Sequence, residues 1–179
     1  KSNKKIVLKG DKSLSKRDFS RVIKPLKKFG LTFKSNKNSL PLQFRGTNYL
    51  SPIKYDELKG SAQVKSSILL AALNTPGKTV LRCLPSRDHT ERLFKFLNLP
   101  IQIKKYKKYQ IIEFIGQKQY NCFDYKVPGD ISSSAFFIVL TLLSKNSEIT
   151  IRNVNINESR IGIIKILKMM NCKITFKNK

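Results

Sequence analysis

The stretch GSAQVKSSILLAALNTPGKTVLRCLPSRDHTE, residues 60–91, indicates both the fold class and the kind of ligand to expect. It predicts an apolar helix that begins near Ser61, a strand after the Pro76–Gly77 turn, and a second helix that begins after Arg87. A helix start offers unpaired N–H groups and a partial positive charge, which favour phosphates and carboxylates. Ser61, Gln63 and Arg87 add hydroxyl, amide and guanidinium donors. These features predict a small phosphorylated or carboxylated ligand.

The same alternation of helix and strand recurs along the chain. Amphipathic helices with one charged face are predicted after Arg17, Arg87 and Arg160, and a short strand follows each. Two other helices, Ala62–Leu73 and Ala135–Leu143, are apolar nearly all round and are predicted to be buried on all sides. The chain is therefore predicted to be an α+β protein of repeated βαβαββ units of roughly seventy residues. The strands would surround the buried helices, as in an α+β layer architecture or an inside-out α/β barrel.

Strands are predicted where β-branched and aromatic residues cluster between turn signals. Pro25 interrupts the first amphipathic helix, residues 19–29, but apolar residues on both sides predict that the helix continues. Asp130 and the serines after it are expected to cap a helix rather than to act in catalysis. The predicted strands are Ile6–Leu8, Leu31–Phe33, Pro41–Arg45, Ile53–Tyr55, Thr79–Leu81, Ile101–Ile103, Tyr109–Phe114, Glu148–Ile151 and Ile174–Phe176.

Composition excludes several classes of protein. The strongly apolar segments Ile68–Leu73 and 135–143 are too short to span a bilayer, so a soluble, cytoplasmic protein is expected. A single histidine, His89, is too few for a usual zinc site, and it is expected to cap or pack at its helix start. No metal or organic cofactor is implied. The cysteines lack a CxxC pattern and are expected to be buried thiols in a reducing compartment; they are Cys83, Cys122 and Cys172.

The net charge of +25 raises the alternative of a basic nucleic-acid-binding module. Its best candidate segment is Lys104–Tyr109, where lysines alternate with tyrosines. However, only 8 of the 36 basic residues are arginine, the residue favoured for bidentate contacts with phosphates and bases. The lysines are also spread over the chain, so a solvated surface is the simpler interpretation. Lys104–Tyr109 is then predicted to be the turn of a hairpin.

Four motifs in order along the chain carry a resemblance to a known family. They are GDKSLSKR (residues 10–17), GSAQVKS (residues 60–66), SRDHTER (residues 86–92) and VPGDISS (residues 127–133). In wording, order and spacing they resemble the 5-enolpyruvylshikimate-3-phosphate synthase family, and the resemblance covers essentially the whole chain. It implies two domains, each of three βαβαββ units, with the active site in the cleft between them. Residues 1–126 would belong to the first domain, and residues 127–179 would begin the second domain's contribution.

The resemblance also implies a reaction. The enolpyruvyl group of phosphoenolpyruvate is transferred to the 5-hydroxyl of shikimate 3-phosphate, without metal or cofactor, in a protein expected to be a monomer. Ser61, Ala62, Gln63 and Arg87 would bind shikimate 3-phosphate, while Arg17 and Gln63 would bind phosphoenolpyruvate. Each residue also has a simpler alternative. Ser61 is a natural N-cap, Gln63 a solvated first-turn residue, and the two arginines could pair with neighbouring aspartates at positions 18 and 88.

The sequence also departs from the family pattern. The family's N-terminal Lys-Ser and Arg, its Gly-Thr loop, and the Asp, Lys and Arg residues of its last third have no counterparts in these 179 residues. The missing set includes the main acid/base candidates, so no catalytic residue can be named. We expect an internal portion of a longer enzyme that is inactive by itself. Two further alternatives stay open: the sister enzyme that acts on a UDP-linked amino sugar, and a structural pseudo-enzyme.

Overall fold

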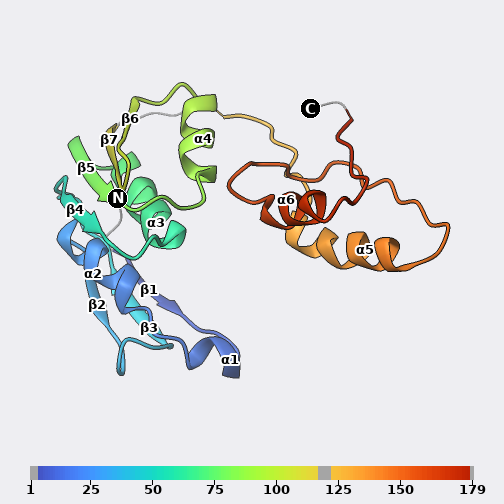
Figure 1. Ribbon diagram of the computed structural model, residues 1–179. Coiled ribbons are helices and arrows are strands. Elements are labelled where there is room, and N and C mark those ends of the chain that lie inside the picture. Colours follow the sequence, from blue (N-terminus) through green and yellow to red (C-terminus); the bar gives the residue numbers. More distant parts are fainter. Residues whose placement is uncertain (1–3, 117–121, 178–179) are drawn as a thin grey trace. The chain divides into compact units, whose positions relative to one another are not determined.

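The computed structural model describes residues 4–116 and 122–177 of the chain. The chain divides into two compact units, Lys1–Asn121 and Cys122–Lys179, here called the N-terminal and the C-terminal unit (Figure 1). The domain boundary expected after residue 126 lies a few residues inside the C-terminal unit. Assignment of these segments to the two domains of an enzyme stays a prediction.

A four-stranded sheet forms the centre of the N-terminal unit, with strand order β4-β5-β7-β6. β4 and β5 are parallel and are joined through α3, whereas β7 is antiparallel to both β5 and β6. Along the chain the order is β4-α3-β5-α4-β6-β7, which is one βαβαββ unit of the predicted kind. The elements are β4 (Lys54–Glu57), α3 (Ala62–Leu73), β5 (Gly77–Cys83), α4 (His89–Phe96), β6 (Ile101–Lys105) and β7 (Gln110–Gly116).

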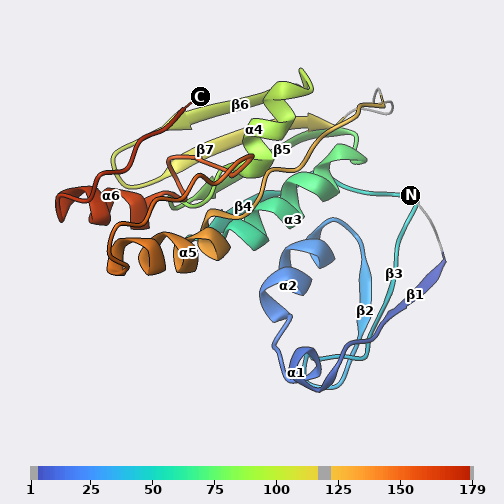
Figure 2. The same ribbon diagram turned by 90° about the vertical axis from the view of Figure 1, so that its right-hand side faces the viewer.

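Helices α3 and α4 cover the same face of this sheet (Figure 2). Ile68 and Leu69 of α3 are buried there, as are Leu81 and Ile112 of the strands beneath them. Between α4 and β7, Phe94 and Phe114 meet with ring centroids 5.0 Å apart. The prediction that α3 is buried on all sides holds only in part, because Leu70 is 53% exposed while Ile68 and Leu69 are buried.

A smaller antiparallel sheet, of order β1-β3-β2, occupies the first part of the chain together with two helices. α2 contacts both β2 and α3, so this part is connected to the four-stranded sheet through the α2–α3 contact. Pro25 lies inside α2 and is buried, and the helix continues through it as predicted. The elements are β1 (Lys5–Leu8), α1 (Lys12–Ser15), α2 (Ser20–Lys28), β2 (Thr32–Lys34) and β3 (Leu42–Arg45).

The C-terminal unit contains α5 (Ile131–Leu143) and α6 (Gly162–Met169) around a small core that includes Ile131, Ile161 and Ile164. The strands predicted at 148–151 and 174–176 are wrong, because both segments lack a regular ladder with another strand in the described part of this unit. The expectation that the 135–143 helix is buried on all sides is also wrong. Phe136 and Leu143 are each 80% exposed, since the described residues of this unit supply too few layers to surround the helix.

The remaining compositional expectations have mixed outcomes. Among the described residues, no helix is both long enough and apolar enough to cross a membrane. Cys83 is buried, and burial raises the pKa of its thiol, which therefore stays protonated near neutral pH. The expectation of buried thiols is wrong for Cys122, which is exposed, and holds only in part for the half-buried Cys172. All three thiols are free.

Candidate anion-binding site

A cavity of about 740 Å³ opens in the N-terminal unit where α2, α3 and two loops meet. One loop leads from β4 into α3 and the other leads from β5 towards α4. All four residues predicted from sequence to bind shikimate 3-phosphate line this one cavity: Ser61, Ala62, Gln63 and Arg87. The full lining is Ser20, Arg21, Lys24, the run from Tyr55 to Val64, Ser86 and Arg87.

The N-terminus of α3 points its free donors at the cavity. Ser61 is the N-cap residue, and its side-chain oxygen accepts a hydrogen bond from the N–H of Val64 at 3.4 Å. A hydroxyl that accepts one bond can still donate its own proton. The N–H groups of Ala62 and Gln63 have no carbonyl within the helix to bond. The capping alternative for Ser61 is therefore correct and leaves its O–H available to a bound anion.

A buried carboxylate shapes the loop in front of α3. Glu57 is only 4% exposed, and its two oxygens accept the N–H groups of Lys59 and Ser61, each at 3.0 Å. Gly60, between these two donors, has φ of +65°, a left-handed conformation that glycine adopts without steric cost. Glu57 thus fixes the course of the loop that delivers Ser61. Sequence reasoning missed Glu57, whose only signal is an acid at the end of a strand, three residues before a glycine.

Gln63 is held in one orientation by a residue that sequence reasoning did not single out. Arg21, on α2, donates from Nη2 to Oε1 of Gln63 at 3.2 Å. With its oxygen engaged, the Gln63 amide presents its NH₂ group as the free donor. Arg21 lines the cavity and is exposed, so its remaining guanidinium donors are also available. Its signal in the sequence is a position one helical turn beyond Arg17 on the charged face of α2.

Arg87 lies on the loop before α4 and is exposed at the cavity. The alternative of a surface pair with Asp88 is not seen, because the Asp88 carboxylate accepts instead from Nε of Arg92 at 2.9 Å. Its neighbour Ser86 also lines the cavity, and the Ser86 hydroxyl is buried with no hydrogen-bond partner in the described structure. Within residues 4–116 and 122–177, Arg87 is thus a cation without a side-chain partner beside the start of α3.

Arg17 is the one predicted ligand that the structure does not bring into this cavity. It is exposed between α1 and α2 and is absent from the cavity lining. A pair with Asp18 is not seen either, since Asp18 accepts the N–H and the hydroxyl of Ser20 at 2.8 and 2.6 Å. These two bonds lower the pKa of Asp18. The role of Arg17 therefore stays a prediction, while Arg21 is the α2 arginine at the cavity.

Positive charge dominates the cavity even though two acids line it. Lys24, Lys59 and the arginines 21 and 87 are exposed there. Of the acids, Asp56 is paired with Arg82, whose Nε and Nη2 lie 3.0 and 3.2 Å from the carboxylate oxygens. Glu57 is occupied by backbone donors, as described above. The free groups are therefore cations, hydroxyls and amide donors, which suit a ligand with phosphate or carboxylate groups.

The motif at residues 127–133 has the structural role that was predicted. Asp130 caps α5 by accepting the N–H of Ser132 at 3.1 Å. Arg160 Nη2 donates to Asp130 at 2.8 Å and also contacts the Ser132 hydroxyl. These contacts, led by the backbone bond from Ser132, lower the pKa of Asp130. Asp130 is therefore a cap and a salt-bridge partner.

Comparison with known proteins decides the family. The family model for EPSP synthase (3-phosphoshikimate 1-carboxyvinyltransferase) matches residues 1–179. The chain belongs to this family. A 3-phosphoshikimate 1-carboxyvinyltransferase of Ruthia magnifica subsp. Calyptogena magnifica is 47% identical over 170 residues, which cover 94% of this chain and 38% of that protein. The 3-phosphoshikimate 1-carboxyvinyltransferase of Thermotoga sp. (strain RQ2) is 41% identical over 170 residues, which cover 94% of this chain and 39% of that protein.

Solved structures agree with the assignment to the EPSP synthase family. EPSP synthase from Acinetobacter baumannii superposes with a TM-score of 0.80 at 36% identity, over 98% of this chain and 39% of that one. The resemblance predicted from the four motifs is thus confirmed. The chain spans about 39% of the length of these relatives, which agrees with the expected internal portion of a longer enzyme.

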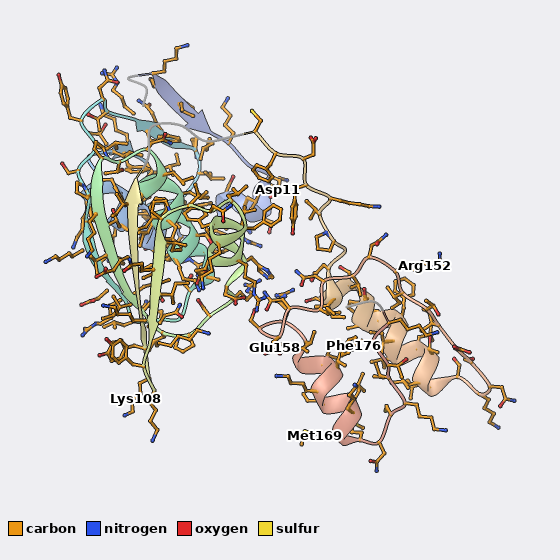
Figure 3. All side chains as sticks on the ribbon, turned by 90° about the horizontal axis from the view of Figure 1, so that it is seen from above. Asp11, Lys108, Arg152, Glu158, Met169 and Phe176 are labelled. Atoms are coloured by element: carbon orange, nitrogen blue, oxygen red, sulfur yellow. The ribbon has the colours of Figure 1, made fainter. Side chains whose placement is uncertain are left out.

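The family assignment does not support the nucleic-acid alternative. Its candidate segment Lys104–Tyr109 lies in a β-hairpin, as predicted, although Lys104 and Lys105 belong to β6 and only residues 106–109 form the turn. Tyr106 and Tyr109 are stacked with ring centroids 4.7 Å apart. Lys108 extends from the tip of this hairpin, away from the sheet (Figure 3). One tyrosine pair is thus stacked on itself rather than presented as an open platform for bases.

Proposed function

We propose that this chain supplies part of the active site of an enzyme that transfers the enolpyruvyl group of phosphoenolpyruvate to the 5-hydroxyl of shikimate 3-phosphate. The observation that carries the proposal is the shared cavity of Ser61, Gln63 and Arg87, donors from two family motifs, residues 60–66 and 86–92. Family membership supplies the reaction class. The enzyme would serve the synthesis of chorismate and the aromatic amino acids.

The cavity suits shikimate 3-phosphate for a chemical reason. This substrate carries a phosphate and a carboxylate, and the cavity offers the start of α3, a hydroxyl, an amide and guanidinium groups. In the proposal Ser61, Ala62, Gln63 and Arg87 bind shikimate 3-phosphate. Gln63 and Arg17 bind phosphoenolpyruvate, for which Arg17 would have to act together with groups outside the cavity described here.

The rest of the proposal concerns the chemistry and the setting. Addition and elimination through a tetrahedral intermediate need a general acid/base and cations that hold two anionic substrates, and they need no metal or cofactor. The acid/base groups would come from parts of the enzyme beyond these 179 residues. Residues 1–126 and 127–179 would belong to two different domains of a cytoplasmic, monomeric enzyme with the inside-out barrel architecture.

Calorimetric titration of the full-length protein that carries this chain tests the proposal. Shikimate 3-phosphate is expected to bind, and phosphoenolpyruvate to be consumed with release of phosphate when both substrates are present. A UDP-linked amino sugar is the matched alternative ligand, because it distinguishes the sister enolpyruvyl transferase. Binding of the UDP-sugar in place of shikimate 3-phosphate would contradict the proposal, and binding of neither would indicate a pseudo-enzyme.

A further inference from the structure

Helix α3, whose first turn lines the cavity, is joined by a buried ion pair to α4, the helix that follows the cavity-lining loop with Arg87. Lys65 of α3 and Glu91 of α4 have side chains 0% and 3% exposed, and their Nζ and Oε1 atoms lie 2.6 Å apart. The second carboxylate oxygen of Glu91 is buried without a hydrogen-bond partner among the described residues. The free energy lost by removing two charges from water is usually about as large as the free energy gained from their attraction. An apolar pair could therefore stabilise this core equally well. Stability alone therefore gives no reason for this pair.

A second polar contact lies directly beside the ion pair. The hydroxyls of Ser66 and Thr90 are 2.6 Å apart, so consecutive residues of α3 meet consecutive residues of α4. Hydrogen bonds and ion pairs restrict distance and angle, whereas apolar packing is non-directional. Two adjacent directional contacts therefore set both the separation of the two helices and their rotation about their own axes.

The Lys65–Glu91 and Ser66–Thr90 contacts lie close in sequence to the donor groups that line the cavity. Lys65 lies one turn beyond Ser61, to whose carbonyl its own N–H is bonded at 3.1 Å. Glu91 lies one turn beyond Arg87 in the sequence. The ion pair thus connects the helix turn that presents Ser61 and Gln63 to the helix turn that follows Arg87.

We propose that Lys65 and Glu91 are positioning residues for the anionic ligand, and that they set the spacing between Arg87 and the donors at the start of α3. This inference rests on the proposed function for the identity of the ligand. Neither residue lines the cavity, so both act through the backbone of their helices rather than by touching substrate. The Ser66–Thr90 contact supports the same spacing.

The test replaces the pair in the full-length protein by an apolar pair of similar size, K65M/E91L. This variant is expected to keep its Tm within a few degrees of wild type, because apolar replacement of a buried ion pair is often neutral or stabilising. Its Kd for shikimate 3-phosphate is expected to rise about tenfold, since small errors in placement weaken oriented contacts strongly. The charge swap K65E/E91K restores a directional link and is expected to recover part of the affinity.

The matched control is K78M/E113L, which removes a Lys–Glu pair of 2.8 Å between β5 and β7, outside the cavity lining. Its Kd is expected to equal that of wild type. An unchanged Kd in folded K65M/E91L would overturn the inference and leave the pair a purely structural role. If K65M/E91L does not fold, E91D decides: its shorter side chain should raise the Kd about threefold, and no change would overturn the inference.

The same experiment separates failure of the inference from failure of the proposed function. If wild type itself does not bind shikimate 3-phosphate, the proposed function fails. The positioning role is then decided by titrating wild type and K65M/E91L with inorganic phosphate while following the amide resonances of Ala62 and Gln63. Weaker phosphate-induced shifts in the variant support the role, and equal shifts overturn it.

Discussion

At the scale of single residues, the cavity is defined by which polar groups are already satisfied and which are free. Asp56 and Glu57 line the cavity but are bound by Arg82 and by two backbone N–H groups. Arg87 has no such partner among the residues that the structure describes, and the neighbouring Asp88 accepts a hydrogen bond from Arg92. The balance of free groups therefore favours an anion, because both acids of the lining are engaged while its basic side chains face the cavity.

The unpaired state of Arg87 leads to the first prediction. Arg87→Ala should raise the Kd for shikimate 3-phosphate by about tenfold to a hundredfold, because a hydrogen bond to a charged group contributes about 1.5–3 kcal/mol. Arg92→Ala is the matched control, since Arg92 is exposed on α4, just after the loop that carries Arg87, but is paired with Asp88. Calorimetric titration measures both. Equal affinities in the two variants would show that Arg87 is only a surface residue.

The contact between Arg21 and Gln63 leads to a second prediction at this scale. Because Arg21 orients the Gln63 amide, the effects of substituting Arg21 and of substituting Gln63 on ligand binding should not be additive. Arg21→Ala and Gln63→Ala should each raise the KM for shikimate 3-phosphate several-fold, and the double variant should be little worse than the more damaged single variant. Lys27→Ala serves as the control, because Lys27 lies on α2 like Arg21 but does not line the cavity. Strictly additive effects in the double-mutant cycle would mean that the two residues act independently.

At the scale of elements, the close approach of α3 and β7 determines the shape of the four-stranded unit. Gly116 ends β7 against the last turn of α3, where an added Cβ would overlap the carbonyl oxygens of Ala72 and Thr75. Thr75 and Thr79 are buried nearby, so this corner has little freedom to shift. A glycine is required at position 116 for steric reasons rather than for its backbone angles.

The steric requirement at Gly116 predicts a large effect of a small substitution. Gly116→Ala should lower the free energy of unfolding by about 3 kcal/mol, since overpacking forces the backbone apart. Gly162→Ala is the control, because a Cβ there meets nothing within 4 Å and alanine favours the helix α6 that begins at this residue. Thermal unfolding of both variants measures the difference. A Tm for Gly116→Ala equal to that of wild type would contradict the packing argument.

The cap of α5 predicts a pH dependence. The hydrogen bond from the Ser132 N–H, and after it Arg160, lower the pKa of Asp130. The Asp130 carboxylate therefore stabilises the folded state at pH values above the ordinary aspartate pKa of about 3.9. This stabilisation is lost as the pH falls through the lowered pKa of the folded state. Carbon-13 NMR titration should place its midpoint below that of a free aspartate. Arg160→Gln should raise the midpoint only part of the way, because the stronger Ser132 contact remains. Arg152→Gln should leave it unchanged, and an unchanged midpoint in Arg160→Gln would contradict the assignment.

At the scale of the whole molecule, the two units differ in how completely they bury apolar surface. The N-terminal unit has a continuous core that packs α3 and α4 on the sheet. The C-terminal unit leaves Phe136, Leu140 and Leu143 more than half exposed on α5. Met169, on α6, is also more than half exposed (Figure 3). Exposed large apolar side chains, when they gather on one face, are typical of an interaction surface. It accords with a chain that spans about 39% of the length of its relatives.

The same comparison predicts the behaviour of the chain taken alone. The isolated 179 residues should release no phosphate from phosphoenolpyruvate in the presence of shikimate 3-phosphate, because the main acid/base residues are expected to lie in the rest of the longer enzyme. A coupled phosphate-release assay measures this, with the full-length protein as positive control. Turnover by the isolated chain would show that its own residues suffice for catalysis.

The amino-acid sequence by itself determined the elements whose signals are local. The bounds of α3, the Ser61 cap, the hairpin around Lys104–Tyr109 and the continuation of α2 through Pro25 were all predicted correctly. Each depends on helix or strand periodicity and turn chemistry within a few residues. The family assignment was also accessible, because the motifs that carry it are contiguous stretches.

Only the tertiary structure decided which side chains meet. It brought Arg21 rather than Arg17 to the cavity, paired Lys65 with Glu91, and turned Glu57 onto the backbone before α3. It also left α5 exposed and two predicted strands unpaired. The physical reason is common to all of these. Burial, ion pairing and strand pairing depend on partners distant in sequence, and local propensity contains no information about whether such a partner is present.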